Sequence, residues 1–168
     1  TQNPIEMEGT YPLPEAQRDR FMTRITMGYP SRDSELEMLE RHGAHNPLDE
    51  LYPVTHGERI TELIDVVGSV YVADVVKDYL VNIVAATRSH DAVRLGASPR
   101  ASLHLIRTAR AKAPLAGRDY VIPDDVQAMA IPVLAHRLLP STRAQLDGIS
   151  PVDIVSQILT STPVPEQA

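Results

Sequence analysis

The chain has 168 residues and a formal net charge of −6, which argues against broad nucleic-acid binding, because that function needs dense positive charge facing the phosphates. It contains no cysteine, which excludes disulfide bonds and thiolate chemistry and is typical of a reducing compartment. No apolar run approaches the roughly 20 residues that span a bilayer, and the first residues lack the pattern of a secretion signal. We therefore expect a cytoplasmic or membrane-peripheral protein with no membrane span.

The first part of the chain favours a loop, a short helix, a strand and a second helix. Residues 1–13 are rich in proline and glycine and predict a loop. Residues 14–20 have room for two helical turns, and residues 22–28 nearly alternate and contain β-branched side chains, which predicts a short strand. Ser31 is the expected N-cap of a helix that ends near His42, because acidic residues follow it at the positive end of the helix dipole.

The character of the sequence changes after residue 54. Residues 43–54 contain one glycine and two prolines but no apolar period, so they predict a connector. Thr55 and Glu58 then have the spacing of a capping box ahead of a helix with one apolar face. The residues of that helix expected to face inward are Ile60, Leu63, Ile64 and Val67.

Four further helices are predicted, near residues 73–88 and 98–113 and from Pro123 and Ser150 onward, so the region after residue 55 is expected to be a helical bundle. Pro132 lies inside the third of them and is expected to kink it or to remove one hydrogen bond. The apolar residues expected to face inward are Val76, Tyr79, Leu80, Ile83 and Val84; Leu105, Ile106, Ala109 and Ala113; Val126, Met129, Ala130, Val133 and Leu134; and Val152, Val155, Ile158 and Leu159.

A series of short motifs runs along the chain. Those in the first part are Thr1-Gln2-Asn3-Pro4, Glu8-Gly9-Thr10-Tyr11-Pro12-Leu13-Pro14-Glu15-Ala16-Gln17, Asp19-Arg20-Phe21 and Gly28-Tyr29-Pro30. Those in the second part are Ala86-Thr87-Arg88, Gly96-Ala97-Ser98-Pro99-Arg100-Ala101, Gly117-Arg118-Asp119-Tyr120-Val121, Pro123-Asp124-Asp125-Val126 and His136-Arg137. Each motif alone is weak, but in their order and spacing the chain resembles the MoxR-type AAA+ ATPases over nearly its whole length.

The resemblance implies the C-terminal part of such an ATPase. Residues 1–42 would be the last loop, strand and helices of the α/β nucleotide-binding core, residues 43–54 a connector, and residues 55–168 a helical lid domain. The expected fold class is therefore mainly α. The sequence has no Gly-x-x-x-x-Gly-Lys-Ser/Thr phosphate loop and no apolar strand that ends in Asp-Glu to hold Mg²⁺, so this part alone is expected to be inactive.

The resemblance assigns two residues near the start to ATP hydrolysis. Asn3 matches sensor 1, a polar side chain that orients the attacking water, although Asn3-Pro4 by itself could begin a turn. Arg20 matches the arginine finger, which enters the ATP site of a neighbouring subunit, where its guanidinium can fork onto phosphate oxygens. Read without the family, Arg20 could be an exposed arginine paired with Asp19 or Glu15. Arg18 replaces an apolar residue usual in the family and stays a second choice for the finger.

Arg100 matches sensor 2, the lid arginine that touches the nucleotide phosphates. In the first turn of its predicted helix it would lie beside free backbone N–H donors, which also attract anions. Arg100, His104 and Arg107 share one stripe of this helix, and His104 and Arg107 are expected on its solvated surface.

Two other groups of residues are not expected to carry chemistry. The Gly117-to-Tyr120 motif should fix the loop before the next helix, because glycine permits a left-handed turn. Ile122 stands where the family usually has a hydroxyl residue, and the loss of that cap would cost on the order of 1 kcal/mol. No metal site is predicted, because no zinc motif matches the spacing of His42, His45, His56 and Glu58.

For the full-length protein the resemblance implies ATP and Mg²⁺ as cofactors and a homo-oligomer, typically a hexameric ring, with chaperone-like work on protein complexes. A partner with a von Willebrand factor A domain is common in the family. The residues alone leave open a free-standing helical interaction module without enzymatic activity. A DNA-binding bundle using the basic stripe of residues 98–113 is disfavoured by the net charge. A phosphate loop upstream of Thr1 would favour the ATPase, and a start codon near Thr1 would favour the module.

Overall fold

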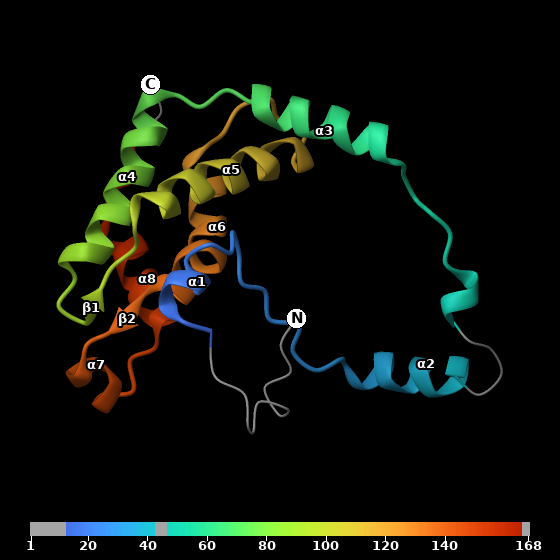
Figure 1. The fold of residues 1–168 in the computed structure, drawn as a ribbon, viewed down its shortest axis with the longest axis horizontal. Helices are drawn as coiled ribbons and strands as arrows, with labels where there is room; N and C mark the ends of the chain where they lie inside the picture. Colours follow the sequence, from blue (N-terminus) through green and yellow to red (C-terminus); the bar gives the residue numbers. More distant parts are fainter. Residues whose placement is uncertain (1–12, 43–46, 166–168) are drawn as a thin grey trace. The chain divides into compact units, whose positions relative to one another are not determined.

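The computed structural model describes residues 13–42 and 47–165, and its elements are labelled in Figure 1. The chain divides into two compact units. The unit of residues 25–66 contains α2 (Arg32–His42), the 3₁₀ turn η2 (Pro47–Glu50) and most of α3 (Gly57–Ser69). The second unit combines the residues up to Arg24 with those from Val67 onward, and we call it the helical unit.

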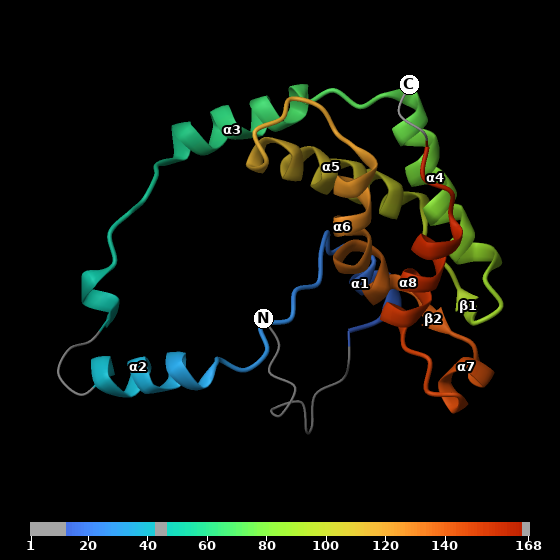
Figure 2. The ribbon, with the colours of Figure 1, turned by 180° about the vertical axis from the view of Figure 1, so that it is seen from behind.

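Four helices form the body of the helical unit: α4 (Asp74–Ser89), α5 (Pro99–Leu115), α6 (Pro123–Leu134) and α8 (Pro151–Ser161). Helix α5 packs against α4 and α6, and α8 packs against the same two helices (Figure 2). Their shared core is aliphatic, and burial of each such side chain contributes about 1.5–3 kcal/mol to stability. The largest fully buried apolar side chains are Ile83, Val84, Leu105, Val126, Val133, Leu134, Ile154, Val155 and Ile158.

Shorter elements complete this unit. Helix α1 (Glu15–Arg18) precedes the four main helices in sequence, while the 3₁₀ turn η3 (Ala135–Arg137) and α7 (Thr142–Leu146) follow α6. Strands β1 (Val93–Leu95) and β2 (Leu139–Pro140) pair antiparallel, so the loop after α4 is joined to the segment after η3. In the described part of the chain, no helix has the length and apolarity needed to cross a bilayer.

The helices predicted after residue 73 are confirmed. All five residues expected to face inward on α4 are buried. Ile106, Met129 and Leu159 are only partly buried. On α8 the expected Val152 is exposed, whereas Ile154 is buried in its place. Apolar residues are nearly continuous along α8, so helical spacing alone does not decide which of them face the core.

The strand predicted at residues 22–28 is wrong. This stretch has no strand hydrogen bonding, and the helix before it is limited to the four residues of α1. A strand needs a neighbour that shares its backbone hydrogen bonds. Here the Arg24 N–H donates instead to the Pro132 carbonyl oxygen of α6, at 2.9 Å.

The predictions for the unit of residues 25–66 are confirmed only in part. Ser31 caps α2, because its Oγ accepts the Ser34 N–H at 3.2 Å. Helix α3 begins at Gly57, so Thr55 is not its N-cap, and none of the residues of this helix is buried. The expected connector contains the 3₁₀ turn η2. An apolar stripe predicts an amphipathic helix but does not say what its partner is.

A buried ion pair holds the loop before α6. Gly117 has a φ of +72°, the left-handed conformation expected of it. Arg118 forks onto the Asp125 carboxylate with two contacts of 2.7 Å. Asp125 Oδ2 also accepts the Ile122 N–H at 3.0 Å. Asp125 therefore supplies one half of a capping box, whereas the isoleucine side chain has no oxygen to accept the Asp125 N–H.

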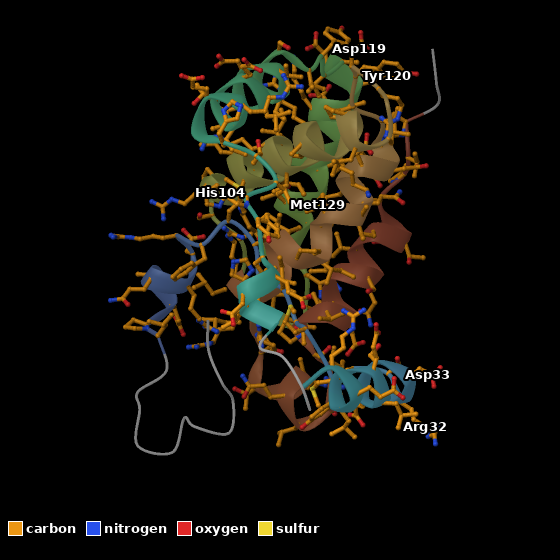
Figure 3. All side chains as sticks on the ribbon, turned by 90° about the vertical axis from the view of Figure 1, so that its right-hand side faces the viewer. Arg32, Asp33, His104, Asp119, Tyr120 and Met129 are labelled. Atoms are coloured by element: carbon orange, nitrogen blue, oxygen red, sulfur yellow. The ribbon has the colours of Figure 1, made fainter. Side chains whose placement is uncertain are left out.

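A parallel bridge ties the start of the helical unit to this same loop. The Tyr71 N–H donates to the Asp119 carbonyl oxygen, and the Val121 N–H donates to the Tyr71 carbonyl oxygen, each at 2.9 Å. Figure 3 shows Asp119 and Tyr120 at one end of the helical unit and Met129 further along α6. The bridge satisfies backbone groups that the loop would otherwise leave unpaired.

Candidate functional site

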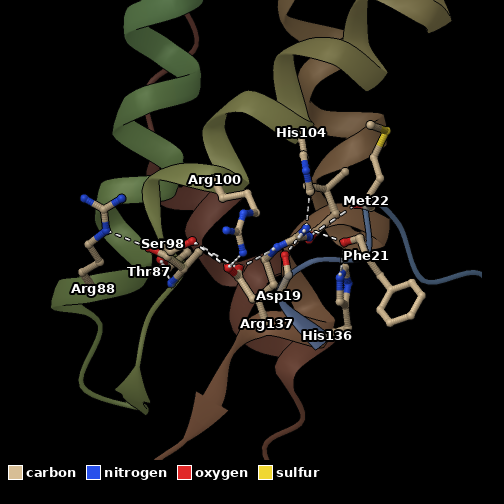
Figure 4. A network of polar contacts seen from close by, with 12 residues as sticks. Asp19, Phe21, Met22, Thr87, Arg88, Ser98, Arg100, His104, His136 and Arg137 are labelled. Atoms are coloured by element: carbon tan, nitrogen blue, oxygen red, sulfur yellow. Dashed lines mark hydrogen bonds and ion pairs between the residues drawn. The ribbon is translucent and has the colours of Figure 1, made fainter. Parts of the chain in front are cut away.

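Polar side chains from three segments meet around Asp19, directly after α1 (Figure 4). The Asp19 carboxylate accepts hydrogen bonds from Ser98 Oγ at 3.1 and 3.2 Å and from Arg100 Nη1 at 2.9 Å. It also accepts one from Arg137 Nε at 3.2 Å. Ser98 and Arg100 stand at the start of α5, and Arg137 ends η3. Asp19 thus attaches the segment that carries Arg20 to the body of the helical unit.

The start of α5 is fixed by close contact with the end of α4. Thr87 Oγ1 accepts the Ala97 N–H at 3.0 Å and donates to the Val84 carbonyl oxygen at 2.6 Å. Arg88 Nε donates to the Ala97 carbonyl oxygen at 2.8 Å. A Cβ at Gly96 would lie 2.6 Å from the Thr87 carbonyl oxygen, so no other residue fits there unless the backbone moves. These contacts set the position of the α5 N-terminus.

Arg100 lies in the first turn of α5 and is available to a second partner. Its side chain is 48% exposed where it pairs with Asp19. Solvent screens such a pair, which contributes about 1 kcal/mol or less. Backbone N–H groups of a first helical turn lack intrahelical acceptors and add to the attraction for anions. Arg100 can therefore exchange Asp19 for another anion at small cost.

Arg20 is exposed, and its guanidinium forms no ion pair or side-chain hydrogen bond with any other residue that the structure describes. The two carboxylates considered as its partners are engaged elsewhere. Asp19 binds Arg100 and Arg137, and Glu15 lies 3.9 Å from Arg94. The pairing of Arg20 with Asp19 or Glu15 is therefore not found.

Arg18 and Arg20 have different surroundings. Arg18 is partly buried, and its Nε is shielded from solvent without a hydrogen-bond partner among the described residues. Helix α1 between Glu15 and Arg18 has no buried residue, so the contacts of Asp19 hold this segment more than packing does. Of the two arginines, Arg20 is the one presented to solvent.

His104 is buried, contrary to the solvated surface expected for it. It points toward Arg137 (Figure 4). Its Nδ1 lies 2.6 Å from Arg137 Nη2. Because a guanidinium only donates, Nδ1 must accept, which requires a neutral imidazole with its proton on Nε2. Burial, followed by the charges of Arg137 and Arg107, lowers the pKa of His104, while Asp19 opposes the shift. Arg107 itself is exposed, as expected.

His136 is a second buried imidazole beside the same arginine. Its Nε2 lies 3.1 Å from the Phe21 carbonyl oxygen and donates to it. Burial, and then the charge of Arg137, lowers the pKa of His136, although the hydrogen bond to Phe21 acts in the opposite direction. Both histidines are therefore neutral parts of the contact between residues 15–24 and the rest of the helical unit.

The free energy of unfolding of this chain is expected to fall as the pH is lowered from about 7 to about 5. Both His104 and His136 have a lowered pKa in the folded state, so below their ordinary value of 6.5 the unfolded chain binds more protons than the folded chain. Their contribution is present above pH 6.5 and is lost as the pH falls through the folded values. Urea denaturation at several pH values measures this loss. The double variant His104→Gln/His136→Gln should flatten the dependence, and an equally steep one would contradict the assignment.

The structure brings two of the three predicted site residues into one neighbourhood. Arg100 contacts the residue next to Arg20, whereas Asn3 lies outside the described residues. Arg137 had no predicted role and Asp19 was considered only as a partner of Arg20, although a charged residue within the apolar run around Leu134 and Leu138 signals a buried ion pair. Among the described residues, no group of three or more His, Asp or Glu side chains could hold a metal ion.

Comparisons with known proteins show which proteins the chain resembles. A model of the AAA lid domain matches residues 85–158, and a model of an ATPase family associated with various cellular activities (AAA) matches residues 1–23. The chain is 46% identical to the uncharacterized protein YeaC of Bacillus subtilis, covering 99% of the chain and 52% of that protein. It is 41% identical to chaperone MoxR1 of Mycobacterium tuberculosis, covering 99% of the chain and 46% of that protein.

A more distant relative and a solved structure also match the chain. The protein MoxR of Paracoccus denitrificans is 30% identical, with 97% of this chain and 54% of that protein covered. The crystal structure of a candidate ATPase from Cytophaga hutchinsonii superposes with a TM-score of 0.91 at 35% identity, covering 99% of this chain and 53% of that one. The chain therefore spans about half the length of the relatives it matches.

The fold and these matches define the class of protein. The chain contains an AAA lid domain, preceded in sequence by a match to an AAA ATPase family. Over 99% of its length it is homologous to chaperone MoxR1, a protein of the MoxR family of AAA+ chaperones. The expected fold class, mainly α with a helical lid, is confirmed.

Proposed function

We propose that this chain contributes three residues to ATP hydrolysis by a longer MoxR-type ATPase. Asn3 would act as sensor 1, Arg20 as an arginine finger toward the neighbouring subunit, and Arg100 as sensor 2 in the lid. The observation that carries the proposal is the contact of Arg100 with Asp19, because it places the lid arginine beside the segment that bears the finger. The match of residues 1–23 to an AAA ATPase family supports the same assignment.

The two arginines suit the outer phosphates of a nucleotide. A guanidinium stays charged and can fork onto phosphate oxygens as negative charge develops on them. Arg20 is exposed and Arg100 half exposed, so both can reach a ligand outside the helical unit. When bound, MgATP would supply the phosphoryl group that is transferred to water. In our proposal another segment of the longer protein holds the Mg²⁺ and the phosphates.

The ion pair between Asp19 and Arg100 supports a role for the lid in sensing the nucleotide. When Arg100 turns toward a phosphate, Asp19 keeps its bonds to Ser98 and Arg137, so no carboxylate is left unpaired. The exchange costs little because the pair is half exposed. The position of the lid would thus depend on whether a nucleotide is bound.

The whole protein would work as a chaperone-like machine. Chaperone MoxR1 and the MoxR proteins among its relatives support this role, and AAA+ proteins typically form oligomers, so we propose a homo-oligomeric ring of six subunits in the cytoplasm. A partner with a von Willebrand factor A domain would be consistent with the family. These proposals concern the longer protein rather than this chain alone.

Nucleotide binding tests the proposal that another segment of the longer protein holds the nucleotide. The longer gene product and this 168-residue chain are compared in titrations with a fluorescent ATP analogue in the presence of Mg²⁺. Measurable affinity is expected for the longer product and little for the chain, because the chain has no phosphate loop. If the longer product has no affinity, the ATPase assignment fails and a helical interaction module becomes the better description.

A further inference from the structure

Arg137 is a buried cation at the contact between residues 15–24 and the rest of the helical unit. Only 1% of its side chain is exposed. Its guanidinium is surrounded by acceptors from both sides of the contact (Figure 4). These acceptors are Asp19 Oδ1, the carbonyl oxygens of Asp19, Phe21, Met22 and Val133, and His104 Nδ1.

The number of acceptors around Arg137 shows that its guanidinium does not bind a ligand. A guanidinium has five N–H groups, and the six acceptors around Arg137 occupy all of them. No N–H remains for a phosphate or another ligand. Arg137 therefore differs from Arg100 and Arg20, which are accessible, and its role must be exerted through the groups that it binds.

Three of these groups belong to the backbone around Arg20. Arg137 Nη2 bonds the Asp19 carbonyl at 3.2 Å and also the Phe21 carbonyl, and Nη1 reaches the Met22 carbonyl at 3.4 Å. Arg137 thus holds the main chain on both sides of Arg20 while the side chain of Arg20 stays free.

We propose that Arg137 is a positioning residue for Arg20: it fixes the backbone on both sides of Arg20 to the helical unit and so sets the direction in which this arginine projects. The inference rests on the proposed finger role of Arg20. Arg100 is attached to the same helical unit through α5. The segment that bears Arg20 therefore moves together with Arg100 rather than independently of the lid.

The attachment of the backbone around Arg20 to the rest of the helical unit is tested on this chain by following two backbone amides. The Arg24 N–H donates across the contact to Pro132, whereas the Val121 N–H donates to Tyr71 in the bridge near the other end of α6. Hydrogen exchange followed by NMR measures the exchange rates of both amides in one sample. In Arg137→Met, the Arg24 amide should exchange about tenfold faster or more, while the Val121 amide should change by less than about twofold.

Two further variants keep this test decisive. Arg143→Met is the matched control, because the Arg143 side chain is 93% exposed, and both amides should exchange as in the parent chain. If Arg137→Met does not fold, Arg137→Lys replaces it. Lysine keeps the charge but lacks the planar fork, so the Arg24 amide should show a smaller acceleration. Unchanged exchange of the Arg24 amide in a folded Arg137 variant would overturn the proposal.

The functional step is tested by ATP turnover of the longer protein. Arg137→Met should lower kcat by about tenfold or more and leave KM for ATP within about twofold, because the finger acts on the transition state rather than on ATP binding. The double variant Arg20→Ala/Arg137→Met should be no slower than Arg20→Ala alone. Arg137→Lys should recover part of the lost kcat.

The outcomes separate the two proposals. If Arg20→Ala leaves turnover unchanged, the finger role fails, and the positioning role fails with it. If Arg20→Ala stops turnover but Arg137→Met does not slow it, only the positioning role is overturned. A loss of kcat in Arg137→Met that adds fully to that of Arg20→Ala would also overturn the positioning role, because Arg137 would then act independently of Arg20.

Discussion

In the longer ATPase, replacement of Arg20 by alanine is expected to slow ATP turnover by about 10³-fold or more and to leave ATP binding nearly unchanged. Arg20 projects from the segment after α1 without a partner among the described residues, so the variant loses no internal contact of the helical unit that the structure describes. An arginine that meets a neighbour's phosphates in the transition state contributes to kcat and little to affinity.

Steady-state kinetics and nucleotide titration of the same preparation measure both quantities. Arg143→Ala is a suitable control, because it also removes an exposed arginine, but one that lies on α7 and pairs with Asp147 rather than with Asp19. Arg18→Ala tests the second choice for the finger. Turnover that survives Arg20→Ala and is lost in Arg18→Ala would move the finger role to Arg18.

Replacement of Arg118 by alanine is expected to lower the free energy of unfolding of this chain by about 3–5 kcal/mol. The side chain of Asp125 is 3% exposed and that of Arg118 20% exposed, so the variant leaves a buried carboxylate without its cation. Breaking one partner of a buried pair costs more than the net contribution of the pair, because the remaining charge is not solvated. Urea denaturation of the parent and the variant measures the difference.

The pH dependence of that difference provides an internal check. Burial alone would raise the pKa of Asp125, but the fork of Arg118 and the Ile122 N–H outweigh it and lower the pKa below the ordinary value of 3.8. The stabilisation is therefore complete above pH 3.8 and is lost as the pH falls through the folded value. Arg143→Ala should cost about 1 kcal/mol or less at every pH, and a similarly small loss for Arg118→Ala would refute the buried pair.

The helices of the lid could be predicted from sequence because each carries its own signal. In α4 the five apolar residues expected to face inward recur at helical spacing and are all buried. Helix α8 begins where it was expected, and Ser150 caps it by accepting the Asp153 N–H at 3.2 Å. Such signals lie within one turn or one face of a helix. They need no knowledge of the rest of the chain.

Elements that depend on a distant partner could not be predicted in this way. Strand β2 has only two residues, Leu139 and Pro140, and exists because β1 pairs with it. The same limit explains the wrong strand at residues 22–28, where the pattern was present but no described segment completes a sheet. Periodicity indicates that a surface needs a partner without identifying it.

In the candidate site, too, the residues in local motifs could be predicted and the contacts between distant residues could not. Arg20 and Arg100 are predicted as site residues from motifs that each lie within a few residues. Asp19 and Arg137 are separated by more than a hundred positions in the sequence, and their contact appears only in the folded chain. His104 was expected on the surface because its stripe contains two arginines, but the approach of Arg137 buries it. A stripe of charges on a helix is therefore not enough to predict exposure.

The central claim, that Arg20 acts on a nucleotide held by another subunit, is tested most directly by mixing two inactive forms of the longer protein. One form carries Arg20→Ala, and the other keeps Arg20 but has its phosphate-loop lysine replaced. If the finger acts between subunits, mixed oligomers should regain ATP turnover, because intact phosphate loops then meet intact arginines from their neighbours. Mixtures that form oligomers by light scattering but hydrolyse no ATP would contradict the claim.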